Sequence, residues 1–97
     1  MVRTVIITRK AQSQRLRILD YWFIRTGNKK YSSELDNGFR HIFKLLSMHG
    51  EMGHQIQNSG FRFFTYKSYQ IIYKVLDNEI VIHQIWDTRK NPNTRNL

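Results

Sequence analysis

Residues 61–93 read FRFFTYKSYQIIYKVLDNEIVIHQIWDTRKNPN, and this stretch decides the fold. Two runs rich in β-branched and aromatic residues, 69–76 and 79–86, flank the pair Asp77-Asn78, which is typical of a two-residue hairpin turn. A weaker turn signal at Lys67-Ser68 separates an earlier strand. The stretch therefore predicts three antiparallel strands followed by a short basic tail.

The turn at residues 77–78 also predicts how the last two strands pair: Ile72 should face His83, and Tyr73 should face Ile82. Side chains alternate across a strand, so each face of the sheet collects its own set. One set is almost continuously apolar and is expected to pack on helices: Tyr69, Ile71, Tyr73, Val75, Ile80, Ile82 and Trp86. The other mixes polar and apolar groups and is expected to be the functional face: Gln70, Ile72, Lys74, Val81, His83 and Ile85.

The chain before this stretch predicts one strand and two helices. Residues 2–7 have strand composition, and Thr8 is a suitable N-cap for a helix over residues 9–26. That segment carries an apolar stripe at helical spacing, and Gly27 is expected to end the helix.

Asn28 can cap a second helix, whose apolar residues recur at intervals of three and four. Ser33 and Asp36 offer a competing capping box one turn later, so two starting points stay open. Gly50 ends the helix and begins the one long loop, residues 50–60. The expected order is β-α-α-β-β-β, an α+β fold in which a helical hairpin packs on one face of a small antiparallel sheet.

Length and charge limit the possible functions. The chain has 97 residues, enough for a single domain over residues 1–97, and its formal net charge is +9. Such an excess suits RNA or DNA, or an acidic protein that neutralises it. The absence of cysteine excludes disulfide scaffolds and thiol chemistry. The N-terminal apolar run Val5-Ile6-Ile7 is too short for a signal peptide or a membrane span, so a soluble cytoplasmic protein with no membrane partner is expected.

No standard enzyme signature is present in the sequence. The histidines His41, His49, His54 and His83 do not have the spacing of a metal site, and neither a metal nor another cofactor is expected. His83 interrupts an apolar strand, where a neutral imidazole can transfer a proton. The alternative interpretation is a partly buried histidine that is satisfied by a neighbour.

A small basic and aromatic surface is expected on the second and last strands of the stretch. Arg62 and Tyr66 lie on one strand with Phe64 between them, and Arg89 follows the last strand. Guanidinium groups hold phosphates and aromatic rings stack on bases. The competing interpretation makes Arg62 and Arg89 solvated edge charges and Phe64 a core residue. Under the first interpretation, the nucleic-acid contacts are expected from Tyr66, Lys67, Gln70 and Lys90.

The chain resembles the RelE/ParE superfamily of type II toxin–antitoxin toxins in an ordered set of segments that covers essentially its whole length. The segments are VIITRKAQSQ (5–14), YWFIRTG (21–27), GEMG (50–53), FRFFTYKSYQIIYKV (61–75) and VIHQIWDTRKNP (81–92). The resemblance implies a toxin neutralised by a cognate acidic antitoxin protein that folds on its surface. It also implies one of two mechanisms: RelE-like members cleave mRNA at the ribosome, without a metal, and ParE-like members poison DNA gyrase.

The resemblance assigns candidate site residues one by one. Arg62 and Arg89 match basic positions of the mRNA-cleaving members. Phe64 and Gln70 stand where those members carry basic residues, the tail contains no tyrosine, and His83 has no family equivalent. The expected function is a ribosome-dependent mRNA endoribonuclease with ribosome and mRNA as partners and Arg62, His83 and Arg89 as catalytic residues. The alternatives are a non-enzymatic poison of DNA gyrase and an inactive member that only binds its antitoxin.

Overall fold

The computed structural model describes residues 2–89. The elements are β1 (Thr4–Ile7), α1 (Arg9–Thr26), α2 (Lys30–Met48), the 3₁₀ turn η1 (Gly50–Met52), β2 (His54–Gln55), β3 (Arg62–Tyr66), β4 (Tyr69–Val75) and β5 (Glu79–Asp87). The strands form one sheet in the order β1-β5-β4-β3-β2, in which β1 runs parallel to β5 and the other neighbours are antiparallel. The expected α+β order is confirmed, with the short β2 added inside the long loop. The parallel β1 makes the sheet mixed, where a wholly antiparallel one was expected.

Both predicted ends of α1 are confirmed. The Thr8 hydroxyl oxygen accepts the Ala11 N–H, and Gly27 adopts the left-handed conformation with φ 75°. The next helix begins at Lys30, whose N–H donates to the side-chain oxygen of Asn28. The competing start at Ser33 is wrong, because that residue lies inside α2.

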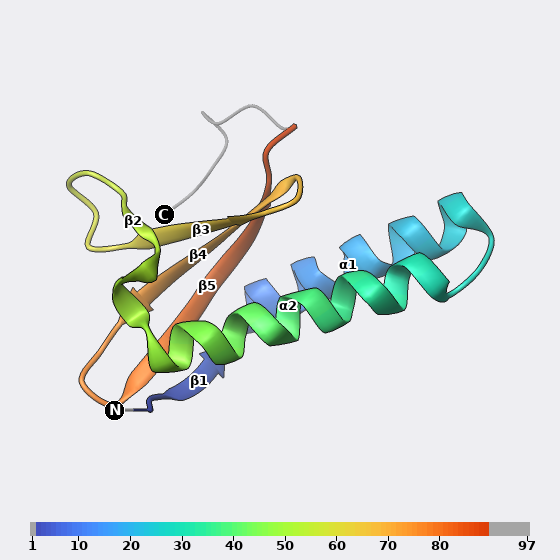
Figure 1. Ribbon diagram of the computed structural model, residues 1–97. Coiled ribbons are helices and arrows are strands. Elements are labelled where there is room, and N and C mark those ends of the chain that lie inside the picture. The colour runs from blue at the N-terminus through green and yellow to red at the C-terminus, as the bar shows by residue number, and fades with distance from the viewer. Residues whose placement is uncertain (1, 90–97) are drawn as a thin grey trace.

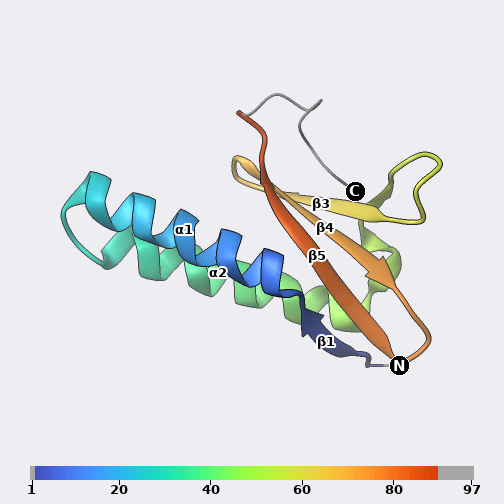
Figure 2. The ribbon, with the colours of Figure 1, turned by 180° about the vertical axis from the view of Figure 1, so that it is seen from behind.

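The two helices form an antiparallel hairpin that packs on one face of the sheet and projects beyond it (Figures 1 and 2). Most of the packing comes from α2, which supplies buried side chains at helical spacing: Leu35, Phe39, Ile42, Phe43 and Leu46. The only buried residues of α1 are Ala11 and Arg15. Among the described residues, no helix is long and apolar enough to cross a membrane.

Polar contacts join the two helices to each other and to the sheet. Arg15, only 8% exposed, donates to the Asp36 carboxylate, which also accepts from Arg40 at 3.1 Å. A buried guanidinium needs such a partner, because desolvating an unpaired charge is costly. Further along the hairpin, Trp22 Nε1 donates to the Tyr69 hydroxyl at 2.8 Å.

Both hairpin turns of the sheet are confirmed, but the register changes along β5. Near the turn at residues 77–78, Tyr73 faces Ile82 as expected. A β-bulge then intervenes, so Ile72 faces Gln84, and the predicted pairing of Ile72 with His83 is wrong. The bulge places one extra residue in β5 and reverses the alternation of the side chains that follow.

The reversal exchanges two large side chains between the faces of the sheet. Ile85, expected on the functional face, is 3% exposed and belongs to the core with its cross-strand partner Ile71. Trp86, expected on the helix-covered face, pairs with Gln70 on the other face, where it is still only 9% exposed. Both expectations failed for one reason, the unforeseen bulge.

Tyr73 holds the turn that follows α2. Its buried hydroxyl donates to the Gly50 carbonyl at 2.7 Å and accepts the Gly53 N–H at 2.8 Å. Burial raises the pKa of this hydroxyl, so it stays protonated and able to donate. A Cβ on Gly53 would lie 2.5 Å from this hydroxyl oxygen and 2.6 Å from the Phe63 carbonyl oxygen, so only glycine fits there.

We predict that Tyr73→Phe lowers the free energy of unfolding by about 1–3 kcal/mol, because it leaves a buried N–H and a buried carbonyl without their partner. Urea unfolding followed by circular dichroism measures this change. Tyr21→Phe, at an exposed ring on α1, is the matched control and should cost less than about 0.5 kcal/mol. Equal costs for the two variants would contradict the role of the Tyr73 hydroxyl.

Candidate functional site

Arg62 is hydrogen-bonded to the backbone of the loop after α2. It pairs with Tyr73 across β3 and β4, and therefore lies on the helix-covered face of the sheet. Its Nη1 donates to the Gly53 carbonyl at 2.8 Å and, at the longer distance of 3.4 Å, to the Glu51 carbonyl. Arg62 and the Tyr73 hydroxyl thus hold the same short loop from two sides.

His83 lies at the bulge, on the opposite face of the sheet. Its ring stacks at a tilt on Phe61, with the centroids 4.7 Å apart, and the Lys74 ammonium lies 5.5 Å from the same Phe61 ring. The His83 carbonyl accepts the Thr8 hydroxyl at 2.9 Å. Burial, and then the positive charges of Lys10 and Lys74, lower the pKa of the imidazole, so His83 is held in its neutral form.

Arg89 follows the end of β5 and is bound by a carboxylate two residues earlier. Its Nη2 and Nε donate to the two Asp87 oxygens at 2.7 and 3.0 Å, and its guanidinium carbon lies 5.9 Å from the centre of the Tyr21 ring. The hydrogen bonds to Asp87 raise the pKa of Arg89, so it carries its charge at every physiological pH. Arg89 is thereby directed toward α1.

The three predicted catalytic side chains do not converge on one point. Arg62 and His83 are on opposite faces of the sheet. Arg62 and Arg89 are at opposite ends of the sheet. Arg62 pairs with Tyr73, whereas Asp87, two residues before Arg89, pairs with Tyr69. Tyr73 and Tyr69 lie about 13 Å apart along β4.

Two of the predicted nucleic-acid contacts pack on the helices. The Tyr66 ring meets Phe39 edge to face, with the centroids 5.4 Å apart. The hydroxyl end of Tyr66 lies against Gly38, where a Cβ would come within 1.8 Å of its oxygen. The Lys67 ammonium lies 5.6 Å and 5.7 Å from the centroids of the Tyr31 and Tyr66 rings.

The remaining two predicted contacts are placed differently. Gln70 lies on the other face of the sheet from Tyr66 and pairs with Trp86. Lys90 lies outside the described residues. Among the three predicted nucleic-acid contacts that the structure describes, Tyr66 and Lys67 lie together and Gln70 lies on the other face.

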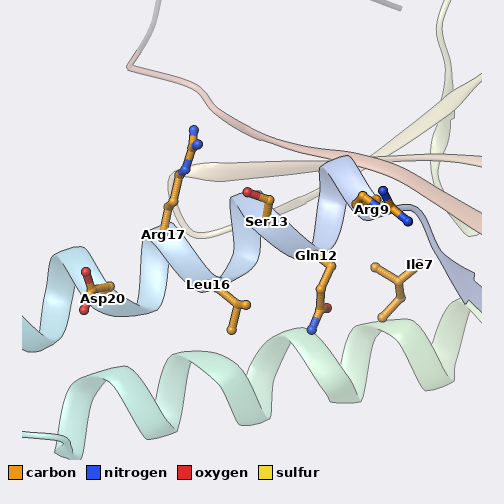
Figure 3. A pocket seen from close by; sticks show the side chains of 7 residues that line it. All are labelled: Ile7, Arg9, Gln12, Ser13, Leu16, Arg17 and Asp20. Carbon is orange, nitrogen blue, oxygen red and sulfur yellow. The ribbon is translucent and has the colours of Figure 1, made fainter.

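The sequence interpretation missed an exposed surface along α1. Within the predicted apolar stripe of this helix, Leu16 is 52% and Phe23 40% exposed. Outside the stripe, Tyr21 is 45% and Ile24 72% exposed. An open groove of about 1020 Å³ runs along α1, and Figure 3 shows Leu16 and Gln12 pointing toward α2 while Arg17 points away. The groove is lined by Ile7, Arg9, Gln12, Ser13, Leu16, Arg17 and Asp20. The signal in the sequence that could have predicted this exposed surface is that the helix carries more apolar residues than a small sheet can cover.

A second, more enclosed pocket of about 340 Å³ lies on the other side of Arg17, between α1 and the edge of β5. Its lining combines aromatic and aliphatic residues with polar ones: Gln14, Arg17, Ile18, Tyr21, Tyr69, Ile85, Trp86 and Asp87. Within residues 2–89, no group of three histidine, aspartate or glutamate side chains is placed to hold a metal ion.

Comparison with known proteins gives a family and a fold. Residues 5–92 match the family model described as "ParE toxin of type II toxin-antitoxin system, parDE". The fold is similar to a solved structure titled "Chromosomal ParDE TA system from P. aeruginosa", with a TM-score of 0.76 and 20% sequence identity over 87% of this chain and 94% of that chain. Comparison with curated protein sequences finds no significant match.

We predict that His83 makes the protein less stable in mild acid. Folding lowers the pKa of His83, so the unfolded chain binds the proton more readily than the folded chain. The contribution of His83 to the free energy of unfolding is therefore present above pH 6.5 and is lost as the pH falls through the folded pKa. The free energy of unfolding, measured between about pH 8 and about pH 5, should fall less in His83→Gln than in the wild type. His41→Gln, an exposed position on α2, is the control and should behave as wild type. Equal pH dependence in all three proteins would contradict the assignment.

Proposed function

The chain belongs to the family of ParE toxins of type II toxin–antitoxin systems, and from this membership we propose that it arrests growth by poisoning DNA gyrase, without cleaving mRNA. The observation that carries the proposal is the separation of Arg62, His83 and Arg89. Transfer of a phosphate to a ribose 2′-hydroxyl needs a base, an acid and a cation within about 3 Å of one reacting group. Side chains on opposite faces and opposite ends of a sheet cannot surround a single phosphate.

The hydrogen bonds of Arg62 add to this argument. To stabilise a phosphorane, Arg62 would have to leave the carbonyls of Glu51 and Gly53 and cross from the helix-covered face. The loop would then lose one of the two side chains that hold it, since only Tyr73 would remain. A non-enzymatic inhibitor needs no such rearrangement.

Ribosome-dependent mRNA cleavage is the second candidate. It is favoured by the match of Arg62 and Arg89 to basic positions of the cleaving branch of the superfamily. It requires His83 as the acid or base, and the lowered pKa of His83 keeps the imidazole neutral and able to accept a proton. The two candidates therefore differ in whether His83 is needed.

A toxin–antitoxin system implies an antitoxin as the partner of this chain. We propose that the antitoxin is acidic where it contacts the toxin. The support is the net charge of +9, which an acidic partner neutralises and which speeds their association.

We predict that expression without antitoxin arrests growth, induces DNA breaks and leaves translated mRNAs intact. Primer extension on an induced mRNA tests for cleavage, and the purified protein incubated with DNA gyrase, ATP and a supercoiled plasmid should accumulate linear DNA. His83→Ala should stay fully toxic, because poisoning gyrase uses no proton transfer. New 5′ ends within codons that vanish when translation is blocked, together with loss of toxicity in His83→Ala, would establish the nuclease instead.

A further inference from the structure

The loop between β2 and β3 forms a pocket of about 390 Å³ at the end of the sheet away from the projecting helices (Figure 1). Residues 55–62 line it. The hydroxyl of Ser59 accepts the Phe61 N–H at 3.1 Å and donates to the Ile56 carbonyl at 2.7 Å. The Ile56 N–H in turn donates to the Phe61 carbonyl at 2.8 Å. Hydrogen bonds within the loop therefore hold the shape of this pocket.

The side chains of the pocket can hydrogen-bond to a polar ligand. Gln55, Gln57 and Asn58 are exposed, and within residues 2–89 their amide groups have no hydrogen-bond partner. A carboxamide offers both a donor and an acceptor, which is the combination that recognises the edge of a nucleobase. Among the described residues, the lining adds one cation, Arg62, and no carboxylate. The pocket therefore suits a ligand such as a nucleobase.

Phe61 connects this pocket to cations on the face of the sheet opposite the helices. It lines the pocket, and its ring stacks on His83, with the Lys74 ammonium 5.5 Å from the ring centroid. Lys74 is exposed, and the positive charges of Lys10 and Lys74 both act on His83. An aromatic ring beside lysines suits single-stranded nucleic acid, because the ring stacks on a base and the ammonium groups neutralise phosphates.

We propose that the pocket and the adjoining cations bind one nucleotide of single-stranded DNA. Its base enters the loop pocket beside the Phe61 ring, and its phosphate contacts Lys74. A single strand is required, because the bases of a duplex are already paired and stacked. The choice of DNA over RNA rests on the proposed function, in which the toxin acts on DNA gyrase and meets the DNA that this enzyme holds.

The test is fluorescence anisotropy of a labelled DNA single strand of about ten nucleotides, titrated with the full-length toxin at several salt concentrations. Phe61→Leu removes the ring of the proposed site. Phe23→Leu is the matched control, at a phenyl ring on α1 that is 40% exposed. We expect the Kd to rise at least about fivefold for Phe61→Leu and less than about twofold for Phe23→Leu. Circular dichroism should show the same fold for both variants.

Lys74→Gln tests the phosphate contact, and Lys44→Gln on α2 is its control, because both side chains are exposed. Loss of one phosphate contact should lower the slope of log Kd against the logarithm of the salt concentration by about 0.7. The control should leave this slope unchanged. Equal slopes in the two variants would mean that the net charge of +9 attracts DNA without a defined site, and would overturn the proposal.

Two further outcomes would overturn the proposal. An unchanged Kd for Phe61→Leu would remove the stacking ring from the site. Equal or tighter binding of a DNA duplex, or of an RNA strand of the same sequence, would refute a site for single-stranded DNA. These titrations contain no gyrase, so a toxin that binds the strand as expected but does not poison gyrase refutes only the proposed target. A toxin that poisons gyrase but does not bind the strand refutes only this site.

Discussion

The extra residue that forms the bulge in β5 determines more of this structure than any other single feature. Because the alternation of side chains reverses there, Ile85 enters the core and Trp86 turns to the other face. The same reversal directs the Ile85 N–H to the open edge, where Gln14 receives it. His83 lies at the bulge, on the face away from Arg62, where regular alternation already placed it. The entry of Ile85 into the core and the covering of the β5 edge by Gln14 therefore have one origin.

Sequence reasoning identified the local structure well, because local chemistry determines it. The cap at Thr8, the left-handed Gly27 and the turn after Leu76 each depend on a few neighbouring residues. The bulge depends instead on how two strands and α1 fit together. Nothing in the run IVIHQIW distinguishes a regular strand from one with an extra residue. The pairing was predicted correctly up to Ile82, and the error began at the next residue.

The candidate site was harder to predict, because a cation in the sequence does not reveal its partners. Arg15 pairs with a buried carboxylate, Arg62 holds loop carbonyls, and Lys67 lies against two tyrosine rings. Each of these charges is used in holding the fold together. The net charge of +9 favours an anionic partner as a class, but it does not show which cations remain to contact one. Exposed cations lie on α1, at Arg17 and Arg25, and also on other elements, at Lys30, Lys44 and Lys74.

The length of the helical hairpin explains why α1 retains apolar surface in an otherwise well-packed chain. The hairpin projects beyond the sheet, so within residues 2–89 part of α1 packs on α2 alone (Figure 2). Exposed apolar side chains such as Ile24 and Leu16 remain on it, and they bring a free-energy cost in water. Burial of these side chains by another protein would stabilise the folded chain, because anything that binds only the folded state shifts the folding equilibrium toward it.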